Sequence, residues 1–312
     1  MKKADKKNLY DELIKNLIQL TNTEFSNSEM KIDDIENSIL NELESAAKLQ
    51  KKLDNNNIRK FNNSFYFEKK FFNLIILLHE SLWLIFAKYF YNQEVKIEIS
   101  EYDRNKMVTY LFILSNLINN LLATLKLLER GLSQSSDILF RNYMELSEIG
   151  VAILNDNSYY ETYKKECESE REEFSKWNKT RPSKTFKVVK NALYKIEIDE
   201  FYKIFYEVRN TLYGFTSKTV HGNIEAIVKG ALSFDDNSES VKLSIYGNIN
   251  TNIENNFTNY FIYSKTIIQA ITVILVKDYK LHFDKFGEEG RYHVFLQSLT
   301  DKIFKIYLKM KN

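Results

Sequence analysis

The chain is short of the residues that make turns and crosslinks. Its 312 residues include one proline, eight glycines and one cysteine, whereas an average soluble chain of this length carries about 15 prolines and about 20 glycines. Because β-sandwiches and β-barrels need Gly and Pro at their many turns, this deficit disfavours both architectures. The composition instead favours an all-α protein, a multi-helix bundle with long central helices.

The scarce residues also exclude several kinds of site. The glycines are too scattered for a Gly-rich phosphate loop, lying at positions 131, 150, 214, 222, 230, 247, 287 and 290. Cys167 is the only thiol, so neither an internal disulfide nor a cysteine zinc site can form. The four histidines are His79, His221, His282 and His293, and none has metal-binding spacing. No metal and no cofactor are therefore expected.

The net charge and the N-terminal sequence indicate where in the cell the protein is located. The formal net charge is only +2, so nothing global attracts nucleic acid or anionic lipid. The basic N-terminus is not followed by the apolar core of a secretory signal. Two apolar stretches, Met107–Leu125 and Phe71–Phe90, are long enough to be membrane spans, but three asparagines share one face of the first and charges interrupt the second. Both are interpreted as central helices, with membrane spans as the alternative, and a cytoplasmic location is expected.

Two regions differ in their apolar pattern. Residues 1–57 form an N-terminal helical arm in which apolar side chains recur at spacings of three and four from Ile32 to Leu53, until Asn55-Asn56-Asn57 ends the helix. This pattern fits either a coiled coil that pairs with a second chain or an outer helix packed on its own domain. Residues 58–312 are expected to form the bundle.

Helical periodicity and caps divide the bundle into elements. Ser100 and Asp103 form a capping box, and Gly131 ends the helix that they begin. The segment around Pro182 is expected to be a loop, and alternating residues near 231–246 predict a small β-hairpin insertion. The remaining helices are predicted at 64–91, 134–154, 159–177, 199–214, 217–230, 258–280 and 291–310.

One candidate group of polar residues lies on the predicted helix 134–154. Arg141, Glu145 and Glu148 recur at helical spacing and therefore line one face, with Asn142 beside them. The order Arg then Glu at i,i+4 is the weaker orientation for a simple surface pair. The stripe is either an exposed face or a polar seam with partners elsewhere.

A second group follows Arg209 and Asn210. Gly214 is expected to break that helix, after which Ser217 and His221 lie four residues apart and face the same way. Arginine suits phosphate binding and histidine suits proton transfer near neutral pH. The segment is either one pocket that contains both groups or a capped helix start with an ordinary histidine.

These two segments carry a resemblance. Residues 138–145 (Ile-Leu-Phe-Arg-Asn-Tyr-Met-Glu), followed by residues 213–222 (Tyr-Gly-Phe-Thr-Ser-Lys-Thr-Val-His-Gly), resemble a family of uncharacterised bacterial all-helical proteins, over about the middle third of the chain. That family in turn resembles HEPN domains, helical bundles of RNA-cleaving toxins and phage-defence effectors. HEPN ribonucleases use an Arg-polar pair, four to six residues and then a histidine. Arg209-Asn210 matches the pair, while eleven residues separate Arg209 from His221.

The resemblance implies metal-independent RNA cleavage. His221 would transfer the proton, Arg209 and Arg141 would stabilise charge on the phosphorus, and Glu145 would orient an arginine. Asn142, Asn210 and Ser217 would contact substrate, RNA would be the partner, and the active protein would be a homodimer. The alternative function is a non-catalytic helical sensor or interaction subunit of a defence system, bound to itself or to another protein. A membrane-active effector is a third, more distant alternative.

Overall fold

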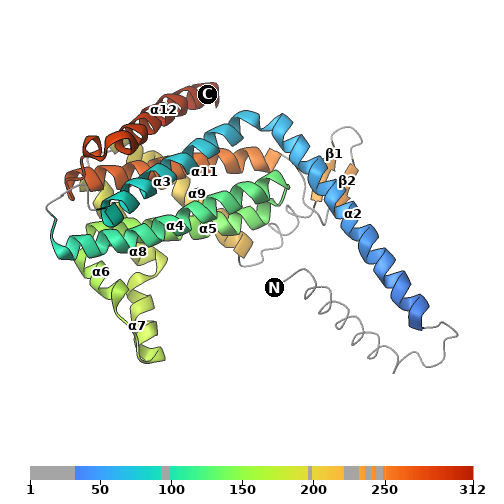
Figure 1. Ribbon diagram of the computed structural model, residues 1–312, viewed down its shortest axis with the longest axis horizontal. Coiled ribbons are helices and arrows are strands. Elements are labelled where there is room, and N and C mark those ends of the chain that lie inside the picture. Colours follow the sequence, from blue (N-terminus) through green and yellow to red (C-terminus); the bar gives the residue numbers. More distant parts are fainter. Residues whose placement is uncertain are drawn as a thin grey trace. The chain divides into compact units, whose positions relative to one another are not determined.

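A computed structural model shows an all-α protein (Figure 1). The structure describes residues 32–92, 99–195, 199–220, 232–235, 240–243, 249 and 251–311. The long helices follow from the composition, because so few glycines and prolines interrupt the apolar periodicity. The all-α fold class is confirmed.

The elements have the following bounds. The helices are α2 (Ile32–Ser64), α3 (Tyr66–Asn92), α4 (Glu101–Glu129), α5 (Ser133–Asn155), α6 (Asn157–Lys164), α7 (Glu170–Thr180), α8 (Pro182–Lys195), α9 (Asp199–Val220), α11 (Thr251–Lys277) and α12 (Gly287–Lys311). A 3₁₀ turn, η1 (Phe283–Phe286), precedes α12. The strands are β1 (Leu232–Asp235) and β2 (Ser240–Leu243).

The two strands pair antiparallel over four residues each, with Leu232 opposite Leu243. A two-stranded ladder of this length is marginally stable at best by itself. It therefore does not support the expected hairpin insertion as a separate part of the fold, and the architecture rests on the helices alone.

The chain divides into two compact units, residues 1–56 and 57–312. α2 continues without a break from Ile32 to Ser64, so Asn55-Asn56-Asn57 does not end the helix as expected. Asparagine is only a moderately poor helix former, and three in succession cost less than a proline would. Unit 1 contains the described residues 32–56, and its residues 1–31 lie outside the described part.

α5 is the central helix of unit 2. It packs against α4, α8, α9 and α11, and α3 packs against α4, α11 and α12 (Figure 1). Aromatic side chains fill the space between α5 and α11, where Phe140 stacks on Tyr260 with ring centroids 3.8 Å apart. Tyr263 contacts Phe205 of α9 at 5.2 Å, which joins α9 to the same core. This arrangement turns one side of α5 toward α9.

The ends of α4 follow the predicted capping. The Ser100 hydroxyl accepts a hydrogen bond from the backbone N–H of Asp103 at 3.0 Å. At the other end Gly131 has a φ of +77°, a conformation that glycine adopts without strain. The prediction of this helix is confirmed.

The region around Pro182 differs from the prediction. Instead of a basic loop, one residue, Arg181, separates α7 from α8, and Pro182 is the first residue of α8. Proline suits the first helical position because its missing N–H has no helical partner there. The expected single helix 159–177 is also two helices, α6 and α7.

Gly214 does not break its helix. α9 runs from Asp199 to Val220 and includes Gly214, which is exposed. A glycine inside a helix costs only about 1 kcal/mol relative to alanine, so the neighbouring turns can maintain the helix. As a result Arg209, Tyr213 and Ser217 lie on successive turns of one helix.

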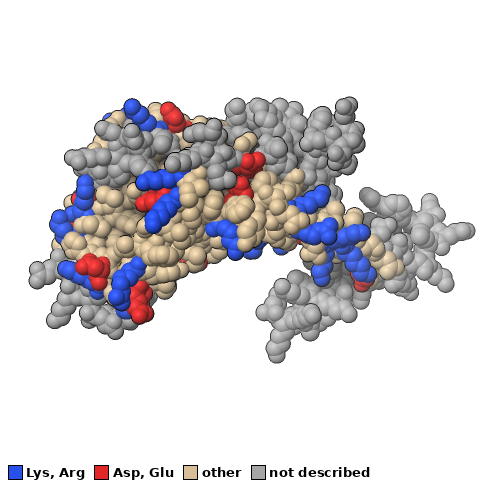
Figure 2. Space-filling model, turned by 90° about the horizontal axis from the view of Figure 1, so that it is seen from above, with Lys and Arg blue, Asp and Glu red and all other residues tan. Residues whose placement is uncertain are grey.

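The expected cytoplasmic location is contradicted by the apolar helices of the described part. The described part contains three helical stretches long and apolar enough to cross a membrane by length and composition: Tyr66–Tyr89, Glu101–Glu129 and Ile253–Lys277, with mean hydropathies of 1.5, 1.6 and 1.3. A bilayer core requires about 20 apolar residues, and the scattered polar residues leave each stretch apolar enough. Figure 2 shows broad uncharged surface between small groups of charged side chains on the face that it draws. The chain is therefore a candidate membrane protein.

Candidate functional site

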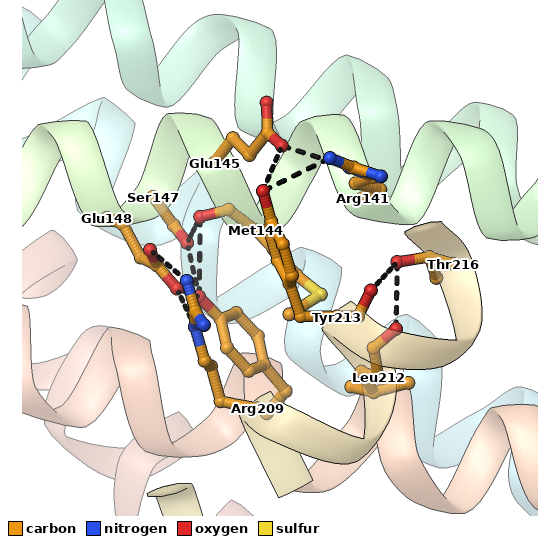
Figure 3. A network of polar contacts seen from close by, with 10 residues as sticks. Arg141, Met144, Glu145, Ser147, Glu148, Arg209, Leu212, Tyr213 and Thr216 are labelled. Atoms are coloured by element: carbon orange, nitrogen blue, oxygen red, sulfur yellow. Dashed lines mark hydrogen bonds and ion pairs between the residues drawn. The ribbon is translucent and has the colours of Figure 1, made fainter. Parts of the chain in front are cut away.

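The predicted stripe on α5 faces α9 (Figure 3). The Arg141 guanidinium donates from Nε to Glu145 Oε1 at 3.0 Å and from Nη2 to the Tyr213 hydroxyl at 3.1 Å. The Tyr213 hydroxyl in turn lies 3.5 Å from Glu145 Oε1. Of the two interpretations of the stripe, the structure shows the polar seam, because Arg141 has a partner on another helix.

Arg141 keeps unused donor capacity. Its Nη1 atom is buried and makes no hydrogen bond to any residue that the structure describes. The Arg141 side chain is 15% exposed and that of Glu145 is 31% exposed, so this pair lies at the rim of the seam. A guanidinium with a donor left over suits a second acceptor such as a phosphate oxygen, and because Nη1 is buried, the side chains that cover it must move before such an acceptor can reach it.

Arg209 makes the second pair of the seam, and this pair is buried. Its Nε and Nη2 donate to the two carboxylate oxygens of Glu148 at 2.9 and 3.2 Å. The two side chains are 9% and 2% exposed. The Tyr263 hydroxyl also donates to Glu148 Oε1 at 3.3 Å. Arg209 therefore already has a bidentate carboxylate partner.

Burial and pairing act in opposite directions on this pair. Burial raises the pKa of the Glu148 carboxyl above its ordinary value, and the Arg209 guanidinium opposes that rise. For Arg209, burial acts to lower the pKa, but its bonds to Glu148 and the charge of that carboxylate outweigh burial and raise it. The arginine stays protonated, and the pair holds α5 to α9.

Tyr213 connects the two pairs. Its ring lies 4.6 Å from the Arg141 guanidinium carbon and 4.4 Å from that of Arg209. Arg209 also lies 3.9 Å from the ring of Phe186 on α8. The aromatic rings thus hold both cations in place by cation–π contacts in addition to the carboxylates.

The other predicted residues lie around this seam. Asn142 is exposed and its amide donates to Asn120 of α4 at 3.3 Å. Asn210 is exposed, next to Arg209 on α9. Ser217 is half-buried, one turn beyond Tyr213 on α9. His221 lies outside the described residues, directly after Val220, the last residue of α9.

The structure adds partners that the sequence hypothesis did not assign. Glu148 pairs with Arg209, and the Tyr213 ring contacts both arginines. Their spacing carried a signal, since Glu148 follows Arg141 by seven residues and Tyr213 follows Arg209 by four, which places each on the same helix face. No sequence signal indicated the contribution of Phe186 from α8.

A buried carboxyl that has no cationic partner among the described residues lies one turn before Arg141. The Asp137 side chain accepts hydrogen bonds from the Tyr260 hydroxyl and from the Asn256 amide of α11, the latter at 2.9 Å. Asp137 is 2% exposed, and burial raises the pKa of its carboxyl to about 7. This group gains or loses a proton near neutral pH.

No group of three or more His, Cys, Asp or Glu side chains with metal-binding geometry exists among the described residues. His79 contacts the Ile75 carbonyl oxygen and the Tyr143 hydroxyl, at 2.8 and 2.9 Å. His293 Nδ1 lies 2.7 Å from the Ser81 hydroxyl. Both are core histidines with protein partners.

Comparison of the chain with protein-family models, curated proteins and solved structures gave no match. The chemistry of the α5–α9 seam therefore carries the functional argument.

Proposed function

We propose that this protein is a HEPN-like endoribonuclease of the toxin or phage-defence type, with the rim cluster of Arg141, Glu145 and Tyr213 as its phosphate-binding centre. The observation that carries the proposal is the Arg141 guanidinium. Glu145 and Tyr213 orient it, while Nη1 makes no hydrogen bond to a described residue. Such a preorganised donor stabilises the charge that develops on a phosphate during cleavage.

The two arginines have different roles in this proposal. Arg209 is the positioning residue, because Glu148 already occupies its guanidinium and the pair is buried. Arg141 contacts the substrate phosphate. His221 transfers the proton, as the sequence hypothesis assigns, and Asn142, Asn210 and Ser217 stay the substrate-contact predictions.

The reaction class follows from these side chains. A base removes the proton of a ribose 2′-hydroxyl, whose oxygen forms a bond to the adjacent phosphorus. The 5′-oxygen of the next nucleotide leaves and takes a proton from an acid. Histidine supplies both proton transfers near neutral pH, and Arg141 neutralises the phosphorane in between.

The test compares variants of the purified full-length chain on single-stranded RNA in EDTA. We expect wild-type protein to cleave, Arg141→Met to lower the rate by roughly 10²–10³-fold, and His221→Ala to lower it by roughly 10²–10⁴-fold. Arg171→Met, at an exposed arginine of α7, is the matched control and should cleave like wild type. Intact RNA with wild-type protein, or equal cleavage by all four, would contradict the proposal.

The second candidate is a non-catalytic helical interaction subunit. It is supported by unit 1, where Leu40, Leu43 and Leu49 of α2 are 37%, 43% and 51% exposed. Apolar side chains exposed along one helix are typical of a surface that pairs with another helix. Light scattering on the full-length chain tests it: a monomer that becomes no larger at high concentration contradicts self-pairing.

A further inference from the structure

Cations and aromatic rings form one continuous series of contacts across α8, α9 and α5. The series begins at the end of α8 and finishes at the rim cluster. Its members, in order of contact, are Tyr194, Lys190, Tyr206, Phe186, Arg209, Tyr213 and Arg141. We name this series the aromatic–cation ladder.

The ladder is buried at Arg209, within the series, and exposed at its α8 end. Arg209 is 7% exposed, whereas Tyr206 and Tyr194 are 41% and 52% exposed. Between these two tyrosines lies the ammonium of Lys190, 5.8 Å from the ring centre of Tyr194 and 6.0 Å from that of Tyr206. The exposed end thus presents two large rings with a positive charge between them.

Positive charge near these rings comes mainly from α8, since α9 carries Asp199, Glu200 and Glu207 beside its own cations. α8 contains four lysines and no acidic residue. Lys187 of α8 and Lys203 of α9 are both exposed. Exposed rings at intervals beside lysines are the combination with which proteins bind single-stranded nucleic acid, because bases stack on the rings while lysines meet the phosphates.

We infer that the exposed end of the ladder is a stacking surface for unpaired bases of single-stranded RNA, leading to the rim cluster. This inference rests on the proposed function and names the substrate class for the same site. Tyr206 touches Phe186, and Phe186 touches Arg209, so side-chain contacts connect the exposed end of the ladder to the seam. Duplex RNA is excluded as the preferred substrate, because its bases are already stacked and its π-faces are covered.

The experiment measures binding and cleavage separately. Fluorescence anisotropy with an end-labelled single-stranded RNA is recorded in the His221→Ala background, which lacks the proton-transfer group but keeps Arg141 in the proposed mechanism. We expect Tyr194→Leu with Tyr206→Leu to weaken binding by roughly tenfold or more, since each stacked base contributes on that scale. Tyr194→Phe with Tyr206→Phe keeps both rings and should bind like the background protein.

Two controls distinguish the expected loss of RNA affinity from misfolding and from nonspecific binding. Tyr292→Leu removes an exposed ring of α12 and should leave the affinity unchanged. A duplex of the same sequence should bind more weakly than the single strand. Equal affinity of the leucine and phenylalanine pairs, preference for duplex, or absence of RNA binding would each overturn the inference.

The outcomes also separate this inference from the proposed function. Ring-dependent binding of single strands without any cleavage by the wild-type protein would support the stacking surface and contradict the ribonuclease. Cleavage that the leucine pair leaves unchanged would support the ribonuclease and overturn the stacking surface.

Discussion

Two arginine–glutamate pairs lie where α5 faces α9. They have the same residue types but differ in hydrogen bonding, in exposure and in the helices that they join. Arg209 and Glu148 are joined by two hydrogen bonds and are 9% and 2% exposed. Arg141 and Glu145 are joined by one and are 15% and 31% exposed. The first pair links two helices, whereas the second lies within α5 and is bonded to α9 through Tyr213.

The difference assigns a structural role to the Arg209–Glu148 pair and a ligand-binding role to Arg141 with Glu145. In a buried bidentate pair the guanidinium is already bound to a carboxylate, and removing one partner leaves the other charge buried and unpaired. The Arg141 guanidinium is less buried than that of Arg209, and its buried Nη1 has no hydrogen-bond partner among the described residues, so it has a donor left for a ligand. In the sequence the two arginines cannot be told apart. Their burial and the number of their hydrogen-bond partners decide which one can bind a ligand.

The largest effect is expected for Glu148→Ala. Removing this carboxylate leaves the Arg209 guanidinium buried beside apolar rings, so the free energy of unfolding should fall by about 3–5 kcal/mol. Denaturant unfolding followed by circular dichroism measures it. Adding Arg209→Met to Glu148→Ala should restore much of the loss, and a loss below about 1 kcal/mol in the single variant would remove the distinction between the pairs.

Asp137→Asn tests what a buried carboxyl does without an arginine. Because folding raises its pKa from 3.8 to about 7, the contribution of Asp137 to stability should be largest below about pH 4 and be lost as pH rises from about 4 to about 7. Asparagine has an oxygen that can accept the bonds from Tyr260 and Asn256, so the variant should lose this pH dependence, which is on the order of a few kcal/mol. Unfolding measured at pH 5 and pH 8 checks it, and an unchanged pH slope would contradict a buried protonated Asp137.

Glu145→Ala is expected to have the smallest effect on stability. The carboxylate is partly exposed, so the free energy of unfolding should fall by less than about 1 kcal/mol. RNA cleavage should nevertheless decrease, because Arg141 loses the group that orients it, and Glu145→Gln should retain more activity than alanine does. A stability loss as large as that of Glu148→Ala would show that the two pairs are equivalent.

Local sequence patterns predicted most helices, but they predicted the ends of these helices correctly in only some cases. The Ser100–Asp103 cap and the left-handed Gly131 were predictable because capping depends on residues three apart. Gly214 and Pro182 were misread, because a helix can include a glycine and begin with a proline when its neighbours favour it. The location was also misjudged, since three helices retain enough apolar length to cross a membrane despite their polar residues.

The candidate site was predictable only in part. Helical spacing placed Arg141, Glu145 and Glu148 on one face of α5, and the same rule now places Arg209 and Tyr213 on one face of α9. Nothing in the spacing indicated that Arg209 would pair with Glu148 across 61 positions, or that Phe186 would lie against its guanidinium. Those partners come from different helices, so only their packing defines them.

The sequence alone determined that the protein is helical and which side chains share a helix face, because both depend on local periodicity and on the scarcity of turn residues. The tertiary structure decided which arginine is buried and which keeps an unused edge. How deeply each arginine is buried depends on how closely α5, α8 and α9 pack. The sequence shows the same residue type, arginine, whether its side chain is buried or exposed.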